Sequence, residues 1–390
     1  MARTALPMGD AAAVDDAAVL LAGRRILDVG KRRLVLRGFS GPVYDLGEAV
    51  LLPGLVNAHS HLELAGLRGL CPPPAGFAAW AAWLVATGRR PPTDALLDRA
   101  VAAMAASGTG AVIDVGSQAG PAVAGALHRA GLAGLVCHEA FGWRRRPKAM
   151  VPAALDAAVA TAAAGSADPP GGNGPVRAAA SGHALYSTSP ETLHLAREAC
   201  RLRRAPFCLH LAEHAEEDAL LRTGGGALAA LLAGSVLPRG YTPPGCSPVA
   251  AAAREGLLGP DVLAVHAVWL DAADRRLLAA SGTSVCLCPR SNARIGVGTA
   301  DAAALWAAGV PLCLGTDSLA SNDDLDLWNE ARALLAAWAD LPGRALLAAL
   351  TTTPARLLGR PGELGCLAPG ALGGIALIPE DLRPRLAGGR

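Results

Sequence analysis

The segment Pro53–Glu63, PGLVNAHSHLE, places two histidines one residue apart at the end of a short apolar run. Side chains two residues apart on a β-strand point to the same face, so the imidazoles of His59 and His61 can reach one point. A lone histidine is more often structural than a ligand, but a pair at a strand end suits a metal ion. The segment therefore predicts a metal site at the end of an early strand.

Beyond this segment, short apolar runs alternate with alanine-rich helical segments, which is typical of βα units and a parallel sheet. The candidate strands are Leu52–Asn57, Ala111–Val115, Gly134–Glu139, Val176–Ser181, Pro206–Leu211, Val262–Val268, Ser284–Cys288 and Pro311–Gly315. The candidate helices include Thr93–Ser107, Pro190–Arg203, Asp271–Ala280 and Asp326–Ala337. Eight strands with intervening helices predict an α/β fold, a (β/α)8 TIM barrel.

The two ends of the chain show a different pattern. Arg25–Val29 and Arg33–Arg37 look like short strands, and Gly362–Ile378 again reads as turns and short strands. We expect residues 1–50 and 360–390 to form a small β-domain beside a barrel domain over residues 51–359. The 390 residues accommodate a barrel of roughly 250 residues and an accessory domain.

Composition excludes several classes of protein. The 35 basic and 33 acidic side chains give a formal charge of +2, without the basic excess of nucleic-acid binders, and Arg144–Arg146 with Lys148 is interpreted as a solvated loop. No apolar stretch approaches the ~20 residues of a membrane helix, and the N-terminus does not resemble a secretory signal. Nine cysteines form no CxxC pair. We expect a soluble cytoplasmic protein with reduced thiols and without nucleic-acid or membrane partners; a homodimer is left open.

Three more polar side chains end later apolar runs: His210 in CLHLAEH, His266 in LAVHAVW and Asp317 in LCLGTDS. The C-terminal strand ends of a (β/α)8 barrel converge on one face, where active sites are built. Histidines and a carboxylate there form a mixed shell for one divalent ion, Zn²⁺ or Fe²⁺, with room for a water whose pKa falls towards ~7. Glu213, three residues after His210, is placed to move a proton from water to a ring nitrogen.

Several segments together resemble the amidohydrolase superfamily, in its cytosine/guanine deaminase and chlorohydrolase branch. They are PGLVNAHSHLE (Pro53–Glu63), HLAEHAEE (His210–Glu217), His266 and LGTDS (Leu314–Ser318). Many members hold two metals bridged by a carboxylated lysine on a barrel strand, but Lys31 and Lys148 lie outside the candidate strands. The resemblance therefore implies one divalent metal ion and hydrolytic removal of an amino group from a heteroaromatic ring.

The resemblance also implies a role for individual residues. The implied metal ligands are His59, His61, His210 and Asp317. The implied catalytic residues are Glu213 as the proton shuttle, His266 as the group that orients the attacking water, and Asp317 as the base that takes a proton from water. His183, in GHALYSTSP, matches a position that often contacts substrate in this branch.

Further segments narrow the choice of substrate within this branch. NAHSHLELAGLRG, the Phe77–Trp80–Trp83 group, HEAFG, CPRSNARIGVG and GTDSLASNDDLDLWNE are similar to the aminodeoxyfutalosine deaminases. This similarity implies conversion of 6-amino-6-deoxyfutalosine to futalosine and ammonia in menaquinone biosynthesis. A purine needs a flat apolar slot with a few directed polar groups. Trp80, Trp83 or Phe141 are candidates for the slot, and Arg290, Ser291 and Asn292 for the hydrogen bonds, with core packing and surface charge as the alternatives.

Other functions compete with this interpretation. Guanine, S-adenosylhomocysteine or adenosine deamination and triazine dechlorination belong to the same branch, and a barrel binding protein with lapsed catalysis is the non-enzyme alternative. One departure concerns the end of the chain, where related sequences carry Ala-Asp and this chain has Gly373-Gly374. We expect that change to weaken the small β-domain or its contact with the barrel, without affecting the metal site.

Overall fold

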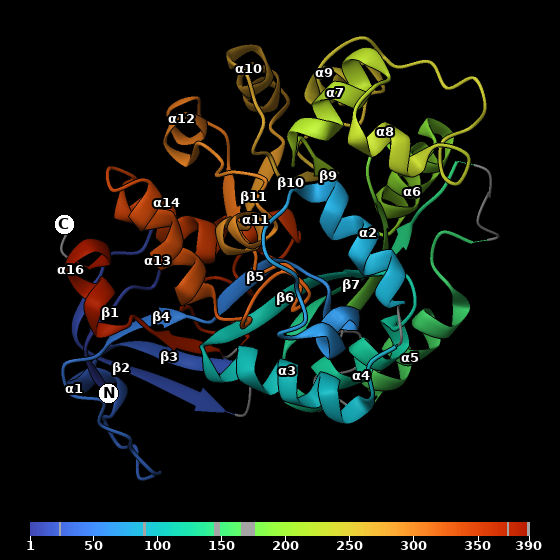
Figure 1. Ribbon diagram of the computed structural model, residues 1–390. Helices are drawn as coiled ribbons and strands as arrows, with labels where there is room; N and C mark the ends of the chain where they lie inside the picture. The colour runs from blue at the N-terminus through green and yellow to red at the C-terminus, as the bar shows by residue number, and fades with distance from the viewer. Residues whose placement is uncertain (23–24, 89–90, 144–148, 165–175, 373, 388–390) are drawn as a thin grey trace.

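The computed structural model describes residues 1–22, 25–88, 91–143, 149–164, 176–372 and 374–387. Within these ranges the strands form a five-stranded mixed sheet, in the order β13-β4-β1-β2-β3, and two four-stranded parallel sheets, with helices packed around them (Figure 1). The predicted α/β class is confirmed. The basic run at residues 144–148, the glycine-rich loop at 165–174 and Gly373 lie outside the described residues.

All eight predicted strands of the main domain are present. One parallel sheet contains β5 (Leu55–Ser60), β6 (Thr109–Gly116), β7 (Ala133–Ala140) and β8 (Val176–Gly182), and the other contains β9 (Phe207–Leu211), β10 (Val262–His266), β11 (Ser284–Leu287) and β12 (Leu312–Leu314). The two sheets touch at both edges. Ser60 and Asp317 form a parallel bridge at one edge, and at the other the His210 N–H donates to the His183 carbonyl at 2.9 Å.

The first predicted strand has wrong bounds. Leu52 belongs to β4 (Val50–Pro53) of the five-stranded sheet, and β5 begins at Leu55, after Gly54. One continuous apolar run thus contributes to two sheets, which hydrophobicity alone does not reveal because both strands are buried. His59 consequently lies inside β5, while His61 directly follows that strand.

The four named helices are confirmed within one residue at each end. The helices are α1 (Arg32–Val35), α2 (Phe77–Thr87), α3 (Asp94–Ala106), α4 (Gly120–Ala130), α5 (Ala153–Ala164), α6 (Pro190–Leu202), α7 (Ala215–Thr223), α8 (Ala227–Leu232), α9 (Pro248–Arg254), α10 (Ala272–Ser281), α11 (Pro289–Ile295), α12 (Ala302–Ala307), α13 (Leu327–Ala337), α14 (Gly343–Leu350), α15 (Thr352–Leu357) and α16 (Arg383–Leu386), with 3₁₀ turns at Leu62–Leu67 and Glu380–Leu382. Side-chain caps mark the N-termini of α6 and α10. Ser189 accepts from the Thr192 N–H, and Asp271 forms a reciprocal capping box with Asp274.

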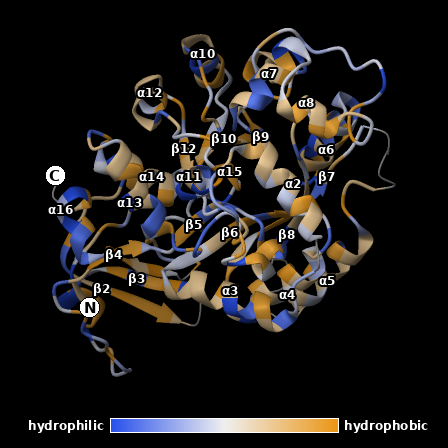
Figure 2. Ribbon diagram, viewed as in Figure 1, coloured by the Kyte–Doolittle hydropathy of each residue, from blue (hydrophilic) through white to orange (hydrophobic). Residues whose placement is uncertain are grey.

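Segments from both ends of the chain share the five-stranded sheet. Its strands are β1 (Ala2–Ala5), β2 (Val14–Ala22), β3 (Arg25–Lys31), β4 and β13 (Ile375–Leu377). Strands β2, β3 and β4 are drawn largely in the hydrophobic colour in Figure 2. The predicted strand at 33–37 is wrong, because a single helical turn, α1, buries Val35 there. Lys31 does lie on a strand, but at the end of β3 in this sheet.

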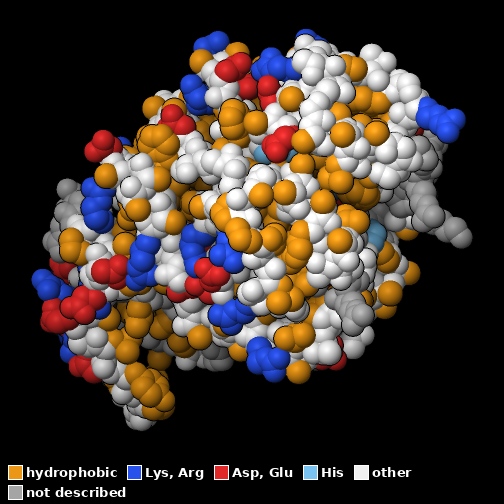
Figure 3. All heavy atoms as spheres, in the orientation of Figure 1, with side chains coloured by type: hydrophobic (Ala, Val, Ile, Leu, Met, Phe, Trp, Pro, Cys, Tyr) orange, Lys and Arg blue, Asp and Glu red, His pale blue; other side chains and the backbone are white. Residues whose placement is uncertain are grey.

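Surface features match the composition. Basic and acidic side chains are interspersed on the face shown in Figure 3, in keeping with a net charge of +2. Among the described helices, none combines the length and apolarity needed to cross a membrane. All nine cysteines are free thiols, and seven of them are buried.

Three glycines join the five-stranded sheet to a parallel sheet. The Gly54 N–H donates to the Gly374 carbonyl at 2.6 Å, and a Cβ at residue 54 would lie 3.1 Å from the Cα atoms of Gly110 and Gly374. Those neighbours are backbone atoms, so they cannot rotate away. The junction therefore has little room for a side chain at residue 54.

We expect Gly54→Ala to lower the free energy of unfolding by about 1–3 kcal/mol, the usual cost of overpacking a close contact. Urea unfolding followed by circular dichroism measures the loss. Gly66→Ala is the control, because a Cβ there has Leu96 Cδ1 as its nearest neighbour, at 3.9 Å. Equal midpoints for the two variants would contradict the tight junction.

Candidate metal centre

The four predicted metal ligands lie close together where the two parallel sheets meet. His61 Nε2 lies 3.3 Å from His210 Nε2 and 3.7 Å from Asp317 Oδ1. His59 Nε2 lies 3.8 Å from the same carboxylate oxygen. His59 comes from β5 and His210 from β9, while Asp317 follows β12 by three residues. The structure thus brings together residues as much as 258 positions apart, between His59 and Asp317.

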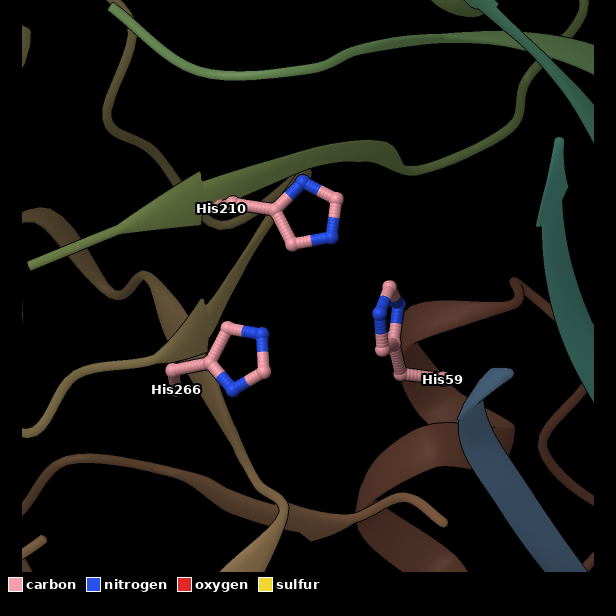
Figure 4. Close-up of side chains that lie close together, drawn as sticks. All are labelled: His59, His210 and His266. Atoms are coloured by element: carbon pink, nitrogen blue, oxygen red, sulfur yellow. The ribbon is translucent and has the colours of Figure 1, made fainter. Parts of the chain in front are cut away.

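The environment of His59 fits a bound cation. Its side chain is fully buried, and neither ring nitrogen has a hydrogen-bond partner among the described residues. Burial lowers the pKa of His59 well below its ordinary value, which favours the neutral ring with one nitrogen lone pair free to bind a cation. His59, His210 and His266 keep ring nitrogens within 4.8 Å of one another (Figure 4). Buried imidazoles that face each other and a carboxylate form the donor set that Zn²⁺ prefers.

Asp317 is held with one oxygen directed at the histidines. Its Oδ2 accepts hydrogen bonds from the hydroxyl groups of Ser291 and Ser321, while Oδ1 faces His59 and His61. Burial opposes ionisation, but the surrounding imidazoles outweigh it and lower the pKa of Asp317 to about 2. Asp317 also has a φ of +55° and His266 one of +77°. Such left-handed backbone in residues with a Cβ is typical of functional sites.

Glu213 and His266 face each other beside this cluster. Glu213 Oε1 lies 3.6 Å from His266 Nε2, and both side chains are buried. Burial raises the pKa of Glu213 well above its usual value, with the charge of Asp317 acting in the same direction. Burial also lowers the pKa of His266 to about 4. Burial thus favours the uncharged form of the Glu213 carboxyl group, which faces a neutral imidazole.

A second buried carboxyl group supports Glu213. Glu217 Oε2 accepts the Glu213 N–H at 2.9 Å, at the start of α7 where Ala212 has a φ of +53°. Glu217 is fully buried, and burial raises its pKa to about 8. The protonated form of Glu217 therefore belongs to the native state at neutral pH.

This raised pKa predicts a pH-dependent stability. The unfolded chain has an ordinary glutamate, so the contribution of Glu217 is complete below about pH 4.5 and is lost as pH rises through about 8. We expect the melting temperature of the wild type, relative to Glu217→Gln, to fall between about pH 5 and pH 9. Calorimetric scans across that range measure the difference. A pH-independent difference would show that Glu217 does not titrate in this range.

A cavity opens above the cluster. It is lined by His61, Glu63, Leu64, Phe77, Trp80, Leu84, Glu139, His183, Tyr186, His210, Glu213, His266, Asp317 and Ser318. Phe77, Trp80 and Tyr186 supply aromatic surface, and Phe77 packs on Trp80 with ring centroids 5.7 Å apart. Of the seven predicted substrate contacts, His183 and Trp80 lie in this wall.

The other five predicted substrate contacts are not among the described lining residues, and one of them, Ser291, donates to Asp317 instead. Phe141 is 42% exposed and meets the His183 ring edge-on, with centroids 5.0 Å apart. Arg290 is bound by Asp324 at 2.6 and 3.0 Å, Asn292 contacts His266, and Trp83 is half-buried on α2.

Sequence reasoning missed two acidic lining residues. Glu139 lies 3.7 Å from His210 Nδ1, and it ends the candidate strand 134–139, so the strand-end rule that selected the histidines could have found it. Glu63 accepts hydrogen bonds from the consecutive N–H groups of Ser117, Gln118 and Ala119, at 3.0, 2.8 and 3.2 Å. No sequence pattern predicts the contact between Glu63 and these N–H groups, because it joins segments that follow two different strands.

Comparisons with known sequences agree with this arrangement. Residues 50–387 match the amidohydrolase family. The chain is 31% identical over 327 residues to a 5-methylthioadenosine/S-adenosylhomocysteine deaminase of Nitratidesulfovibrio vulgaris, covering 81% of this chain and 67% of the relative. A deaminase of the same name from Syntrophobacter fumaroxidans is 30% identical over 381 residues, covering 93% of this chain and 80% of the relative.

Solved structures share the fold. An adenosine deaminase from Xanthomonas campestris with bound zinc superposes with a TM-score of 0.73 at 26% identity, covering 98% of this chain and 84% of the other. An aminofutalosine deaminase from Helicobacter pylori, in complex with methylthio-coformycin, gives a TM-score of 0.79 and covers 96% of this chain and 90% of the other. Its identity of 18% shows likeness of fold alone. The match over residues 50–387 and the 30% identity across most of the chain establish that this protein belongs to the amidohydrolase family.

Proposed function

We propose that the chain is a metal-dependent hydrolase that removes the 6-amino group of a purine nucleoside as ammonia. The observation that carries the proposal is the buried cluster of three histidines and one carboxylate, which faces Glu213 and His266 at the base of a cavity with aromatic walls. Retention of all these groups argues against a binding protein with lapsed catalysis.

The proposed substrates are 5-methylthioadenosine and S-adenosylhomocysteine. Relatives named for these two compounds are about 30% identical over most of the chain. 6-Amino-6-deoxyfutalosine, in menaquinone biosynthesis, is the second candidate, supported by the sequence motifs around Phe77–Trp83 and Cys288–Gly298. All three compounds carry the same 6-aminopurine ring on a ribose and differ in the group attached at the 5′ side, so one catalytic centre serves each of them.

His59, His61, His210 and Asp317 would hold one divalent ion, which we propose to be zinc rather than iron. Zinc is bound in the solved relative from Xanthomonas campestris. Such an ion, when bound, lowers the pKa of a water molecule towards ~7 and so supplies a nucleophile at neutral pH.

Glu213 and Asp317 carry out different proton transfers in the proposed reaction. Glu213, whose protonated form is favoured by burial, donates to a ring nitrogen and makes the carbon that carries the amino group electrophilic. Asp317, ionised because imidazoles surround it, takes a proton from the attacking water. His266 Nε2 faces Glu213 and orients the water between them, while His183 and the aromatic wall position the purine. Asp317 then returns its proton to the amino group, which leaves as ammonia, while the added hydroxyl group loses its proton to Glu213 and remains as the ring oxo group.

The test is ammonia release by protein that has been stripped with a chelator and reloaded with Zn²⁺ or Fe²⁺. 5-Methylthioadenosine, S-adenosylhomocysteine, adenosine, guanine and 6-amino-6-deoxyfutalosine are assayed in parallel. We expect the chelated protein to be inactive, zinc to restore turnover, and the thioether nucleosides to be preferred. A preference for 6-amino-6-deoxyfutalosine would replace the substrate and keep the chemistry. Chloride release from a chlorotriazine without any deamination would refute the proposal.

We also propose that the two parallel sheets close into one (β/α)8 barrel over residues 51–359, with residues 1–50 and 360–390 forming the small β-domain. The Ser60–Asp317 bridge and the hydrogen bond from His210 to His183 join the sheets at both edges and support closure. β4 lies at the boundary between the two parts, since it pairs with β1 and β13.

A further inference from the structure

Helix α11 places two consecutive side chains against two different groups of the site. The Ser291 hydroxyl donates to Asp317 Oδ2, and Asn292 Oδ1 lies 2.9 Å from His266 Nδ1. Asn292 is 1% exposed, and it is not one of the described residues that line the cavity. Its side chain therefore acts on His266 rather than on a ligand.

We propose that Asn292 is a positioning residue that fixes the tautomer of His266, with the proton on Nδ1 and the Nε2 lone pair turned towards Glu213. This inference rests on the proposed function and assigns a task to a side chain that the sequence had suggested as a substrate contact. It concerns the arrangement of protons around the reacting water, not the identity of the substrate.

The chemistry of the two partners sets the direction of the hydrogen bond. An amide oxygen can only accept, and an imidazole with one proton has one donor nitrogen and one acceptor nitrogen. The contact at 2.9 Å therefore places the proton on Nδ1 and leaves Nε2 as the acceptor. Glu213 Oε1 lies 3.6 Å from that Nε2. The opposite tautomer would direct a second proton at the carboxyl group that holds the proton for transfer.

The backbone keeps Asn292 in place. Its N–H donates to the Cys288 carbonyl at 3.0 Å, and its own carbonyl accepts from the N–H groups of Gly296 and Val297, both at 3.0 Å. His266 has a left-handed φ of +77°, a conformation that a residue with a Cβ adopts only when its surroundings impose it. The backbone therefore holds both Asn292, which supplies the acceptor oxygen, and His266, which supplies the ring.

The NH2 group of the Asn292 side chain supports the same role. Asn292 Nδ2 is buried and has no hydrogen-bond partner among the described residues. A buried donor without a partner destabilises a protein, so packing alone would favour an apolar side chain of the same size. The amide oxygen is then the part of the side chain that accounts for an asparagine at this position.

The test uses two substitutions and a matched control in the zinc-loaded full-length chain. Asn292→Leu keeps the volume but removes the acceptor, and Asn292→Asp keeps an acceptor. Asn329→Leu, on α13, replaces an asparagine that contacts Asp324 and Arg332. Long-range ¹H–¹⁵N spectra of protein with ¹⁵N-labelled histidine report which ring nitrogen carries the proton, and a His266→Gln sample assigns the signals.

We expect an Nδ1-protonated His266 in the wild type, in Asn292→Asp and in Asn329→Leu. Asn292→Leu is expected to lose that pattern, with kcat about 10- to 100-fold lower and KM changed far less. Asn292→Asp is expected to recover part of kcat. An Nε2-protonated ring in the wild type, or an unchanged ring and kcat in Asn292→Leu, would overturn the inference. The spectra need no turnover, so they decide the tautomer even if the proposed deamination fails.

Discussion

Replacement of Asp317 by asparagine is expected to lower kcat for ammonia release by at least about 10³-fold. The carboxylate has two tasks in the proposed mechanism, since it faces His59 and His61 as a metal ligand and accepts a proton from water. An asparagine amide can accept a hydrogen bond but cannot take a proton at neutral pH. The effect is measured with 5-methylthioadenosine at saturating zinc.

The Asp317 experiment includes a metal analysis of each sample. We expect reduced zinc content in Asp317→Asn, and normal content and turnover in the control Asp340→Asn, which changes an exposed carboxylate on the surface. Circular dichroism establishes that both variants are folded. Turnover within tenfold of the wild type would exclude Asp317 as the base.

Glu213→Gln has the second large expected effect, a fall in kcat of about 10²- to 10⁴-fold, because the variant has no carboxyl proton to transfer. Burial raises the pKa of Glu213 and so favours the protonated form that the proposed mechanism uses. Glutamine has the same shape and is neutral, so it should preserve the fold and the zinc content.

Zinc content therefore distinguishes Glu213→Gln from Asp317→Asn. Glu213→Gln should lose turnover with zinc bound, whereas Asp317→Asn should also lose zinc. Glu198→Gln on α6 is the control, since Glu198 is exposed and belongs to no part of the site. Single-turnover kinetics at neutral pH measure the chemical step. A rate for Glu213→Gln equal to that of the control would assign the proton transfer to another group.

The proximity of the four predicted metal ligands could be foreseen from the sequence, because strand periodicity and strand ends determine it. His59 and His61 are two positions apart, His210 is the second-last residue of β9 and His266 is the last of β10, so one rule on strand ends groups them. The mixed sheet was harder to predict. Its strands β1 and β2 are short or alanine-rich, and β4 merges with β5 in one apolar run.

The lining of the cavity was harder to predict from the sequence, because it depends on contacts between distant segments. Arg290 is bound to Asp324, 34 residues further along the chain, and no local pattern records such a pairing. Asn292 is in turn held next to His266, 26 residues before it. Both residues lie on α11 and acquire these partners only through tertiary packing.

The position of β4 has a consequence for any shortened form of this protein. β4 lies between β1 and β13, which come from opposite ends of the chain, and it continues through Gly54 into the strand that carries His59. Removal of both flanking strands would leave two rows of unpaired amide and carbonyl groups on β4, the strand that leads into β5. Exposed strand edges recruit other chains. A form of the protein shortened to residues 51–359 should therefore aggregate. The five-stranded sheet prevents this by pairing both edges of β4.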